Sequence, residues 1–279
     1  MPELPEVEAI ARTLRPLVLG QMIRSAHVFH PVLLQPQTST HFIDLVQGAR
    51  IENVSRVGKY LFLKLDCGLL EFHFRFDGQL LWFDSARQLL SRANCKKDGT
   101  HVDVAFEMRS GVLGVVDPRH LARVHVWRNE SECRSLKTLG VDAFSEKFTP
   151  RLLQQELASS EQSLKNFLLD QTRIAGIGNI YSCESLWHAR LDPRRRADSL
   201  QASEADKLHK AIVSVLRRAL ECCLNPAPEF DDPRWWFQGL EPILRAYQRE
   251  GLRCRRCGAG IQRISQDGRS TYCCLHCQT

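Results

Sequence analysis

Four cysteines near the C-terminus constrain this chain more than any other feature of its sequence. They form the pairs Cys254/Cys257 and Cys274/Cys277, with two residues inside each pair and sixteen between the pairs. This is the thiolate spacing of a closed, tetrahedral structural zinc site, so the sequence predicts one structural Zn2+ ion. Cys273 adjoins the second pair, but the two-residue spacing favours Cys274 as the ligand.

The segment between the cysteine pairs predicts a β-hairpin. Two strand-like runs, 261–264 and 270–273, flank a tight turn, and Arg269 stands at its tip. From Leu244 to Thr279 the chain has seven arginines, no lysine and two acidic residues. Such a module is typical of a phosphate-binding surface, although charge alone fits a solvated basic face equally well.

The first half of the chain reads as one helix followed by strands. Apolar residues recur at helical spacing from Val7 to Val18, behind an acidic first turn, which predicts an amphipathic helix. Apolar and polar residues then alternate at 61–65 and 70–76, and again across 102–116, with a turn inside each pair of runs. These patterns predict a β-sandwich.

The second half changes to helical spacing after a linker around 140–145. A glycine-rich turn, GIGN, separates two of the predicted helices. Such a helix pair binds DNA when the N-terminus of the second helix faces a phosphate. An ordinary helix corner has the same sequence pattern. The first predicted helix begins at Thr149-Pro150. Three further helices are predicted over 163–170, 180–190 and 203–223.

We therefore expect an α+β fold with three parts. An N-terminal β-sandwich domain with a helix at its start covers 1–140, and a helical domain covers 141–240. The zinc-finger hairpin covers 244–279. The stretch 225–239 is rich in proline and reads as a loop.

The first six residues, MPELPE, contain a candidate nucleophile. Removal of Met1, which the small Pro2 permits, leaves a secondary amine, and roughly a tenth of an α-amino group is unprotonated at neutral pH. Its attack on a carbonyl-like carbon, such as C1′ of a sugar losing its base, gives an iminium that acts as an electron sink, with Glu3 placed to shuttle protons. The same residues also suit an ordinary acidic helix cap, so the rest of the chain decides between the two interpretations.

Composition indicates the cellular compartment in which such chemistry would take place. The chain has 279 residues, a net charge of +6 and eleven cysteines, an odd number that fits a reducing compartment better than a disulfide framework. The start of the sequence has no leader pattern, and no apolar run approaches the length of a membrane span. We expect a cytoplasmic, nucleoid-associated protein without a membrane partner.

Several motifs together resemble the formamidopyrimidine-DNA glycosylase and endonuclease VIII family. They are MPELPEVE at the start, GKYL at 58–61, DPR at 117–119, GIGNIY at 176–181 and the four-cysteine hairpin. The resemblance runs from end to end, and the N-terminus and Glu184 after GNIY are closer to the formamidopyrimidine branch. It implies a β-sandwich joined to a helical domain with a helix-two-turn-helix motif and a zinc finger.

The resemblance also implies a function: a bifunctional DNA glycosylase and AP lyase of base excision repair that removes oxidised purines, namely 8-oxoguanine and formamidopyrimidines. Pro2 would attack C1′ and Glu3 would protonate the opening deoxyribose, after which the strand is nicked by β,δ-elimination. Lys59 matches a proton-donating, phosphate-contacting lysine, and Arg269 matches an arginine of the second elimination. The implied partner is double-stranded DNA with a damaged base or an abasic site, bound by a monomer.

The DNA-binding residues depart in part from the family's pattern. The branch fills the gap left by a flipped base with methionine, arginine and phenylalanine, and the matching positions here are Phe76, Arg119 and Leu121. Only the arginine is kept, but an apolar wedge can also be built from Phe and Leu; we call these three the wedge residues. Glu161 replaces a frequent basic phosphate contact, and the 225–239 loop lacks the glycine and threonine typical of relatives. A structural role is the simpler interpretation of both His73 and His101, which lie on or beside predicted strands, although His101 could still touch a phosphate. The expected DNA-binding set is Glu6, Phe76, His101, Arg119, Leu121 and Asn179.

Three alternatives remain at this point. An endonuclease VIII-like glycosylase would act on oxidised pyrimidines instead. A catalytically silent DNA-binding relative is argued against by the presence of Pro2, Glu3 and Lys59 together. A zinc-ribbon adaptor for RNA or protein would explain the cysteines but not the N-terminus.

Overall fold

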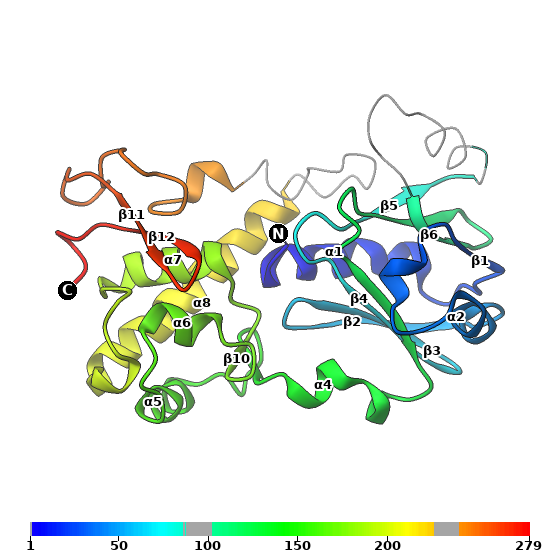
Figure 1. The fold of residues 1–279 in the computed structure, drawn as a ribbon, viewed down its shortest axis with the longest axis horizontal. Helices are drawn as coiled ribbons and strands as arrows, with labels where there is room; N and C mark the ends of the chain where they lie inside the picture. Colours follow the sequence, from blue (N-terminus) through cyan, green and yellow to red (C-terminus); the bar gives the residue numbers. More distant parts are fainter. Residues whose placement is uncertain (1, 86, 88–101, 226–239) are drawn as a thin grey trace. The chain divides into compact units, whose positions relative to one another are not determined.

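The chain divides into two compact units in the computed structural model, which describes residues 2–85, 87, 102–225 and 240–279 (Figure 1). Unit 1 comprises Met1–Lys137 with Cys223–Gly239, and unit 2 comprises Thr138–Cys222 with Leu240–Thr279. Within the described ranges, no helix has both the length and the apolar character needed to cross a membrane.

Unit 1 opens with helix α1 (Leu4–Val18), and its start is stabilised by acidic side chains. Glu3 is the N-cap residue, and its backbone N–H donates to the Glu6 carboxylate at 2.7 Å, as in a capping box. Pro5 occupies the first turn, where its missing N–H is no loss. One face of the helix is buried, through residues spaced three or four apart: Val7, Ile10, Leu14 and Val18.

Two four-stranded antiparallel sheets form the rest of unit 1. The first has the order β1 (Ser25–Val28), β6 (Val102–Glu107), β7 (Val112–Val116), β5 (Gln79–Phe83). The second has the order β2 (Ile51–Val57), β3 (Tyr60–Leu65), β4 (Gly68–His73), β8 (Arg123–Trp127). The turn η1 (Pro31–Leu34) and helix α2 (Ser39–Val46) lie between β1 and β2 in the chain.

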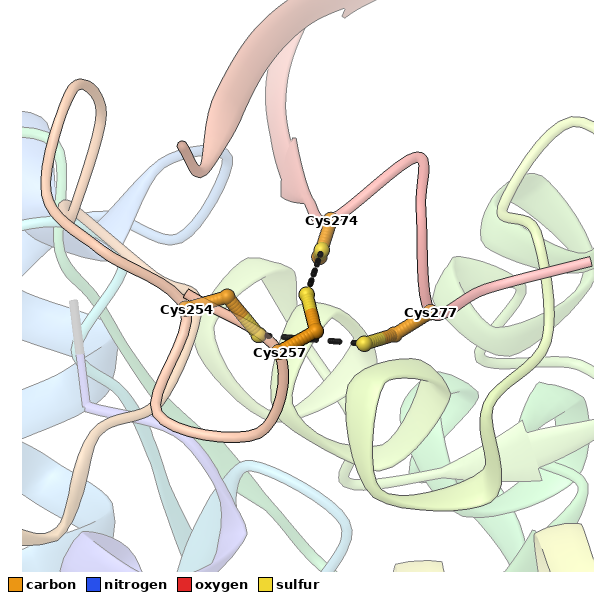
Figure 2. Close-up of side chains that lie close together, drawn as sticks. All are labelled: Cys254, Cys257, Cys274 and Cys277. Carbon is orange, nitrogen blue, oxygen red and sulfur yellow. Dashed lines mark hydrogen bonds between the residues drawn. The ribbon is translucent and has the colours of Figure 1, made fainter. Parts of the chain in front are cut away.

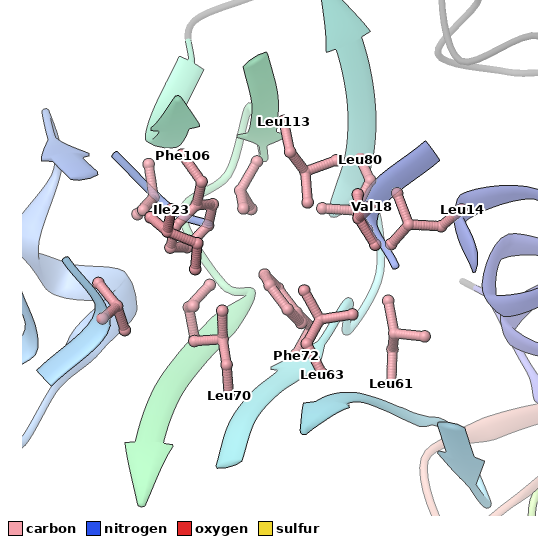
Figure 3. Close-up of a cluster of buried hydrophobic side chains, with 14 of the residues drawn as sticks. Leu14, Val18, Ile23, Leu61, Leu63, Leu70, Phe72, Leu80, Phe106 and Leu113 are labelled. Carbon is pink, nitrogen blue, oxygen red and sulfur yellow. The ribbon is translucent and has the colours of Figure 1, made fainter. Parts of the chain in front are cut away.

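The core of unit 1 lies between the two sheets and α1, which confirms the predicted sandwich (Figure 3). Inward side chains of both sheets meet there, at less than 2% exposure. Truncation of a leucine, isoleucine or phenylalanine in such a core to alanine costs about 2–5 kcal/mol. The labelled members are Leu14, Val18, Ile23, Leu61, Leu63, Leu70, Phe72, Leu80, Phe106 and Leu113.

The outer face of the β3–β4 hairpin is also covered, which the alternating pattern does not predict. Phe62 and Leu69 form a second buried cluster with Cys133, from the segment that follows β8. Glu71 is only 5% exposed, and its carboxylate accepts a hydrogen bond from Trp127 Nε1 at 2.6 Å. The segment after β8 also contains η2 (Glu130–Glu132) and α4 (Arg134–Thr138).

Unit 2 is largely helical, and side-chain caps begin two of its helices, the predicted cap Thr149 and in addition Ser163. The Thr149 hydroxyl accepts from the backbone of Leu152, and the Ser163 hydroxyl accepts from that of Asn166. The elements are β9 (Val141–Asp142), α5 (Pro150–Ala158), α6 (Leu164–Leu169), β10 (Ile174–Ala175), α7 (Asn179–Ala189), η3 (Ala197–Ser199), most of α8 (Ala202–Leu224) and η4 (Glu241–Ile243). Strands β9 and β10 form a short parallel pair.

The chain ends in an antiparallel hairpin of β11 (Gln262–Gln266) and β12 (Arg269–Cys273), and β12 lies beside α7 (Figure 1). Its two turn residues, Asp267 and Gly268, have φ angles of 46° and 73°, as a type I′ turn requires. Arg269 is thus the first residue of β12, paired with Gln266.

Candidate functional site

The candidate nucleophile lies at the N-terminus of α1. Pro2 is buried, and Glu3 is 1% exposed. A helix N-terminus carries partial positive charge, which favours an unprotonated amine over an ammonium. Glu6 is fully buried, and its carboxylate accepts the Glu3 N–H that begins the helix. The acidic cap and the candidate nucleophile therefore share the same few residues.

Lys59 lies in the two-residue turn between β2 and β3, where Val57 pairs with Tyr60. Gly58 has a φ angle of +58°, which glycine adopts without steric cost. Lys59 is 9% exposed. The turn therefore holds a lysine side chain against the protein rather than extending it into solvent.

A partly buried ion pair ties α1 to this turn. Arg56 donates through Nε to Glu8 Oε2 at 2.8 Å and through Nη1 to the Gly58 carbonyl at 3.1 Å. Burial opposes ionisation of Glu8, but hydrogen bonds from Arg56 and Arg12 outweigh it and hold the pKa of Glu8 below its usual value. The contact thus fixes the helix that follows Pro2 against the turn that carries Lys59.

His73 lies next to this turn as an uncharged group. Its ring packs on Tyr60, with the ring centroids 4.4 Å apart. Burial, together with the nearby charges of Arg75 and Lys59, lowers the pKa of His73 to about 3. The imidazole is therefore neutral at physiological pH.

The loop after β7 presents Arg119 and Leu121 to solvent. The buried Asp117 carboxylate accepts backbone N–H groups from both of these residues and from Ala122, at 2.6–3.0 Å. Arg119 lies over the Phe76 ring at 5.0 Å and pairs with Asp77. Phe76 and Leu121 are 50% and 38% exposed. The structure thus brings the predicted wedge residues into neighbouring loops, with apolar side chains facing water.

A second group of predicted residues meets in unit 2. Asn179 is the first residue of α7, and its Nδ2 donates to the Ser270 carbonyl at 3.0 Å, next to Arg269. The fully buried Lys165 donates from Nζ to the Asn179 carbonyl at 3.2 Å, which joins α6 to α7. Arg269 faces a cleft of about 450 Å³, whose lining is Gln162, Asn166, Leu169, Asp170, Asp267 and Arg269.

The four predicted metal ligands converge at the base of the hairpin (Figure 2). Their sulfur atoms lie within 4.8 Å of one another, with 3.5 Å between Cys257 and Cys274 and 4.0 Å between Cys254 and Cys277. Four thiolates at about 2.3 Å from Zn2+ lie about 3.8 Å apart in a tetrahedron, so these residues fit a tetrahedral metal ion. Cys273 is outside the cluster, and burial raises its pKa to about 11.

The remaining predictions from the sequence concern His101, the 225–239 loop and Glu161. His101 and residues 226–239 lie outside the described part of the chain. Glu161 is described, and it is exposed and pairs with Arg196 at 3.4 Å.

Sequence reasoning missed the residues that support these sites. Asp117 lies in the DPR motif and Glu184 follows GNIY, but the sequence assigns a role to neither. Glu184 is 2% exposed and accepts three backbone N–H groups, from residues 245–247, each at 2.8 Å. Burial raises the pKa of Glu184 above its usual value. An acidic residue inside an otherwise buried helix was the available signal.

Three domain families match the sequence. Residues 1–124 match the formamidopyrimidine-DNA glycosylase N-terminal domain, and residues 139–225 match the formamidopyrimidine-DNA glycosylase H2TH domain. Residues 251–279 match the zinc finger found in FPG and IleRS.

Whole-chain relatives agree with these matches. Formamidopyrimidine-DNA glycosylases from Shouchella clausii and Desulforamulus reducens are each 34% identical, over all of this chain and 99% of theirs. Solved structures of Lactococcus lactis Fpg with DNA containing an oxidised pyrimidine or N7-benzyl-Fapy-dG have TM-scores of 0.86 at 28% identity, and each comparison covers 99% of both chains. The chain belongs to the formamidopyrimidine-DNA glycosylase family.

Proposed function

We propose that this protein is a DNA glycosylase and AP lyase of base excision repair. Its substrates are oxidised purines, 8-oxoguanine and formamidopyrimidines, in double-stranded DNA. The observation that carries the proposal is the buried Pro2-Glu3 pair at the start of α1, in a family whose solved complexes contain damaged-base and abasic-site DNA. Acting on chromosomal DNA, the enzyme works as a monomer in the cytoplasm, at the nucleoid.

The reaction begins at the amine of Pro2, after removal of Met1. The nitrogen attacks C1′, the glycosidic bond breaks and the base departs; Glu3 protonates the sugar ring oxygen as the ring opens. The product is an iminium between Pro2 and C1′. Its positive charge makes the C2′ proton acidic, so the 3′ phosphate leaves by β-elimination. The 5′ phosphate follows by δ-elimination.

The remaining residues bind the DNA and hold the damaged nucleotide. Lys59, in the turn between β2 and β3, contacts a DNA phosphate and donates a proton. Asn179 and Arg269, which lie in unit 2, bind other phosphates of the DNA. Phe76, Arg119 and Leu121 fill the gap left by the flipped nucleotide, because base chemistry requires extrusion. Their exposure on neighbouring loops supports this role. Glu6 contributes through the helix cap, and a zinc ion held by the four cysteines fixes the hairpin.

Borohydride trapping on abasic-site DNA tests the proposal. Reduction of the iminium leaves a covalent adduct, which we expect peptide mapping to place on Pro2. Pro2→Gly should trap far less, and a form that retains Met1 should trap none. Pro5→Ala is the matched control, since it removes a proline from the same turn without touching the amine. An adduct on a lysine, or no adduct, would contradict the mechanism.

A preference for oxidised pyrimidines is the second candidate. Phe76 and Leu121 favour it, because they differ from the methionine and phenylalanine that fill the gap in the duplex in the formamidopyrimidine branch. In addition, the structure of Lactococcus lactis Fpg was solved with DNA that contains an oxidised pyrimidine. Excision from matched duplexes carrying 8-oxoguanine or an oxidised pyrimidine separates the two. The primary proposal requires faster excision of the purine.

A further inference from the structure

We infer that His30, Asp103 and His120 form a second site for a divalent metal ion, distinct from the four cysteines. The Nδ1 atoms of both histidines lie 2.8 Å from Oδ1 of Asp103. The three ligand atoms lie within 4.8 Å of one another, and the imidazole centroids are 4.4 Å apart. The inference rests on this geometry and does not depend on the proposed function.

Backbone contacts bring three distant segments to this point. Asp103 lies in β6, and its carbonyl accepts the backbone N–H groups of Phe29 and His30, at 2.8 and 3.1 Å. Its Oδ2 accepts the backbone N–H of Asp117 at 2.6 Å. His120 follows in the same loop, with a φ angle of +52°, which is uncommon for a non-glycine residue. The fold therefore directs both imidazoles at one carboxylate oxygen.

Hydrogen bonding leaves this cluster incomplete. His120 Nδ1 is hydrogen-bonded to Asp103 Oδ1. His30 Nδ1 lies at the same distance without hydrogen-bond geometry, and it is a buried nitrogen with no hydrogen-bond partner among the described residues. Buried polar atoms are rarely left in this state. A metal ion would use the lone pairs of both nitrogens and the carboxylate charge together.

The donor set suits a first-row divalent cation such as Zn2+. Two imidazoles and one carboxylate are a recurrent set for such ions, and catalytic zinc sites often have three protein ligands with a solvent molecule in fourth position. Asp103 is fully buried, whereas the His30 and His120 side chains are 42% and 36% exposed. The carboxylate is thus fixed while the imidazoles border solvent, which provides an entry path and room for that fourth ligand.

An ion here would restrain the loop that carries the wedge residues. His120 stands between Arg119 and Leu121, so its coordination ties that loop to β6 and to the segment before η1. Metal occupancy would therefore limit the movement of the loop without contacting the candidate nucleophile.

The test is a calorimetric titration of the full chain with Zn2+, after its four-cysteine site has been filled. We expect the wild type to bind one further equivalent. His30→Gln and His120→Gln should each weaken this step by more than about tenfold, since loss of even an outer-shell partner has such an effect. The matched control is His27→Gln, because His27 also faces a carboxylate, Glu107 at 3.1 Å, but belongs to no three-ligand cluster among the described residues.

Co2+ then reports the ligand type. We expect the further equivalent to give a spectrum without thiolate charge-transfer bands, which separates it from binding at a cysteine. Thermal unfolding followed by circular dichroism checks that each variant is folded. The inference is overturned if the wild type binds no further equivalent, if both histidine variants bind it as the wild type does, or if thiolate bands accompany it.

Discussion

Arg269 shows how a single residue is placed by its local backbone. The turn of Asp267 and Gly268 fixes the start of β12. Asn179 donates a hydrogen bond to the carbonyl of Ser270, the residue after Arg269. An arginine on a backbone held in this way loses less conformational entropy on binding a phosphate.

We predict that Arg269→Ala weakens DNA binding equally for all sequences. Loss of one phosphate contact should lower the slope of log K against log salt by about 0.9. Fluorescence anisotropy at several salt concentrations measures the slope. Arg194→Ala is the control of equal charge, because Asp192 already pairs with Arg194 at 2.6 Å. An unchanged slope would remove Arg269 from the interface.

His73 makes stability depend on pH. Its pKa is lowered from 6.5 to about 3 in the folded protein, so the unfolded chain binds more protons between these values. Stability should therefore be full above about pH 6.5 and fall as the pH is lowered towards 3, with a slope of at most about 1.4 kcal/mol per unit. Urea unfolding at a series of pH values should show a shallower fall for His73→Gln. The exposed His41→Gln should keep the wild-type slope, and an equally steep fall for His73→Gln would refute the assignment.

At the scale of elements, the buried Asp117 carboxylate holds the loop at 117–122 through three backbone N–H groups, in addition to the Asp103 contacts to Asp117 and His120. Asp117→Ala leaves three backbone N–H groups without their acceptor, and we expect a loss of about 2–4 kcal/mol in the free energy of unfolding. Asp117→Asn keeps one oxygen acceptor and should lose less. The control is Asp77→Ala, an exposed acid that pairs with Arg119 in the neighbouring loop. Equal unfolding midpoints in urea for wild type and Asp117→Ala would show that the loop is held otherwise.

Elements whose cause is local were predictable from the sequence. The helix cap at Thr149 and the turn at Asp267-Gly268 each depend on side chains within a few residues. Burial of Glu71 was not predictable, because Trp127 and Cys133, which cover it, are distant in sequence. Strand alternation identifies an apolar face but does not report what packs on the other one.

At the scale of the whole molecule, each unit has an apolar core of its own. The core of unit 1 lies between its sheets. A separate cluster in unit 2 joins Trp187 and Ala246 to Ile261, Cys254 and Cys274. Three of the metal ligands therefore belong to the packing of unit 2, Cys254 and Cys274 as buried members and Cys277 packed against them, whereas none belongs to the core of unit 1.

We predict that removal of the metal unfolds the hairpin and abolishes DNA binding while the sandwich stays folded. A four-thiolate site supplies folding energy directly, on the order of 10 kcal/mol or more. Hydrogen exchange after chelation should rise in β11 and β12 and stay slow in β3 and β4. Cys274→Ser should reproduce the effect, and the neighbouring Cys273→Ser should retain the metal. Tight DNA binding by the metal-free protein would contradict this prediction.

The sequence by itself determined the features whose cause lies within a short stretch of chain. The spacing of the cysteines, the acidic start of α1 and the alternation of β3 and β4 were sufficient, because ligand geometry, the helix dipole and the pleat act over a few residues. Only the tertiary structure decided which distant groups meet. It placed Arg56 between Glu8 and Gly58, directed His30 and His120 at Asp103, and put Asn179 beside Ser270. The physical reason is that hydrogen bonding and desolvation depend on distance in space, which the order of residues does not record.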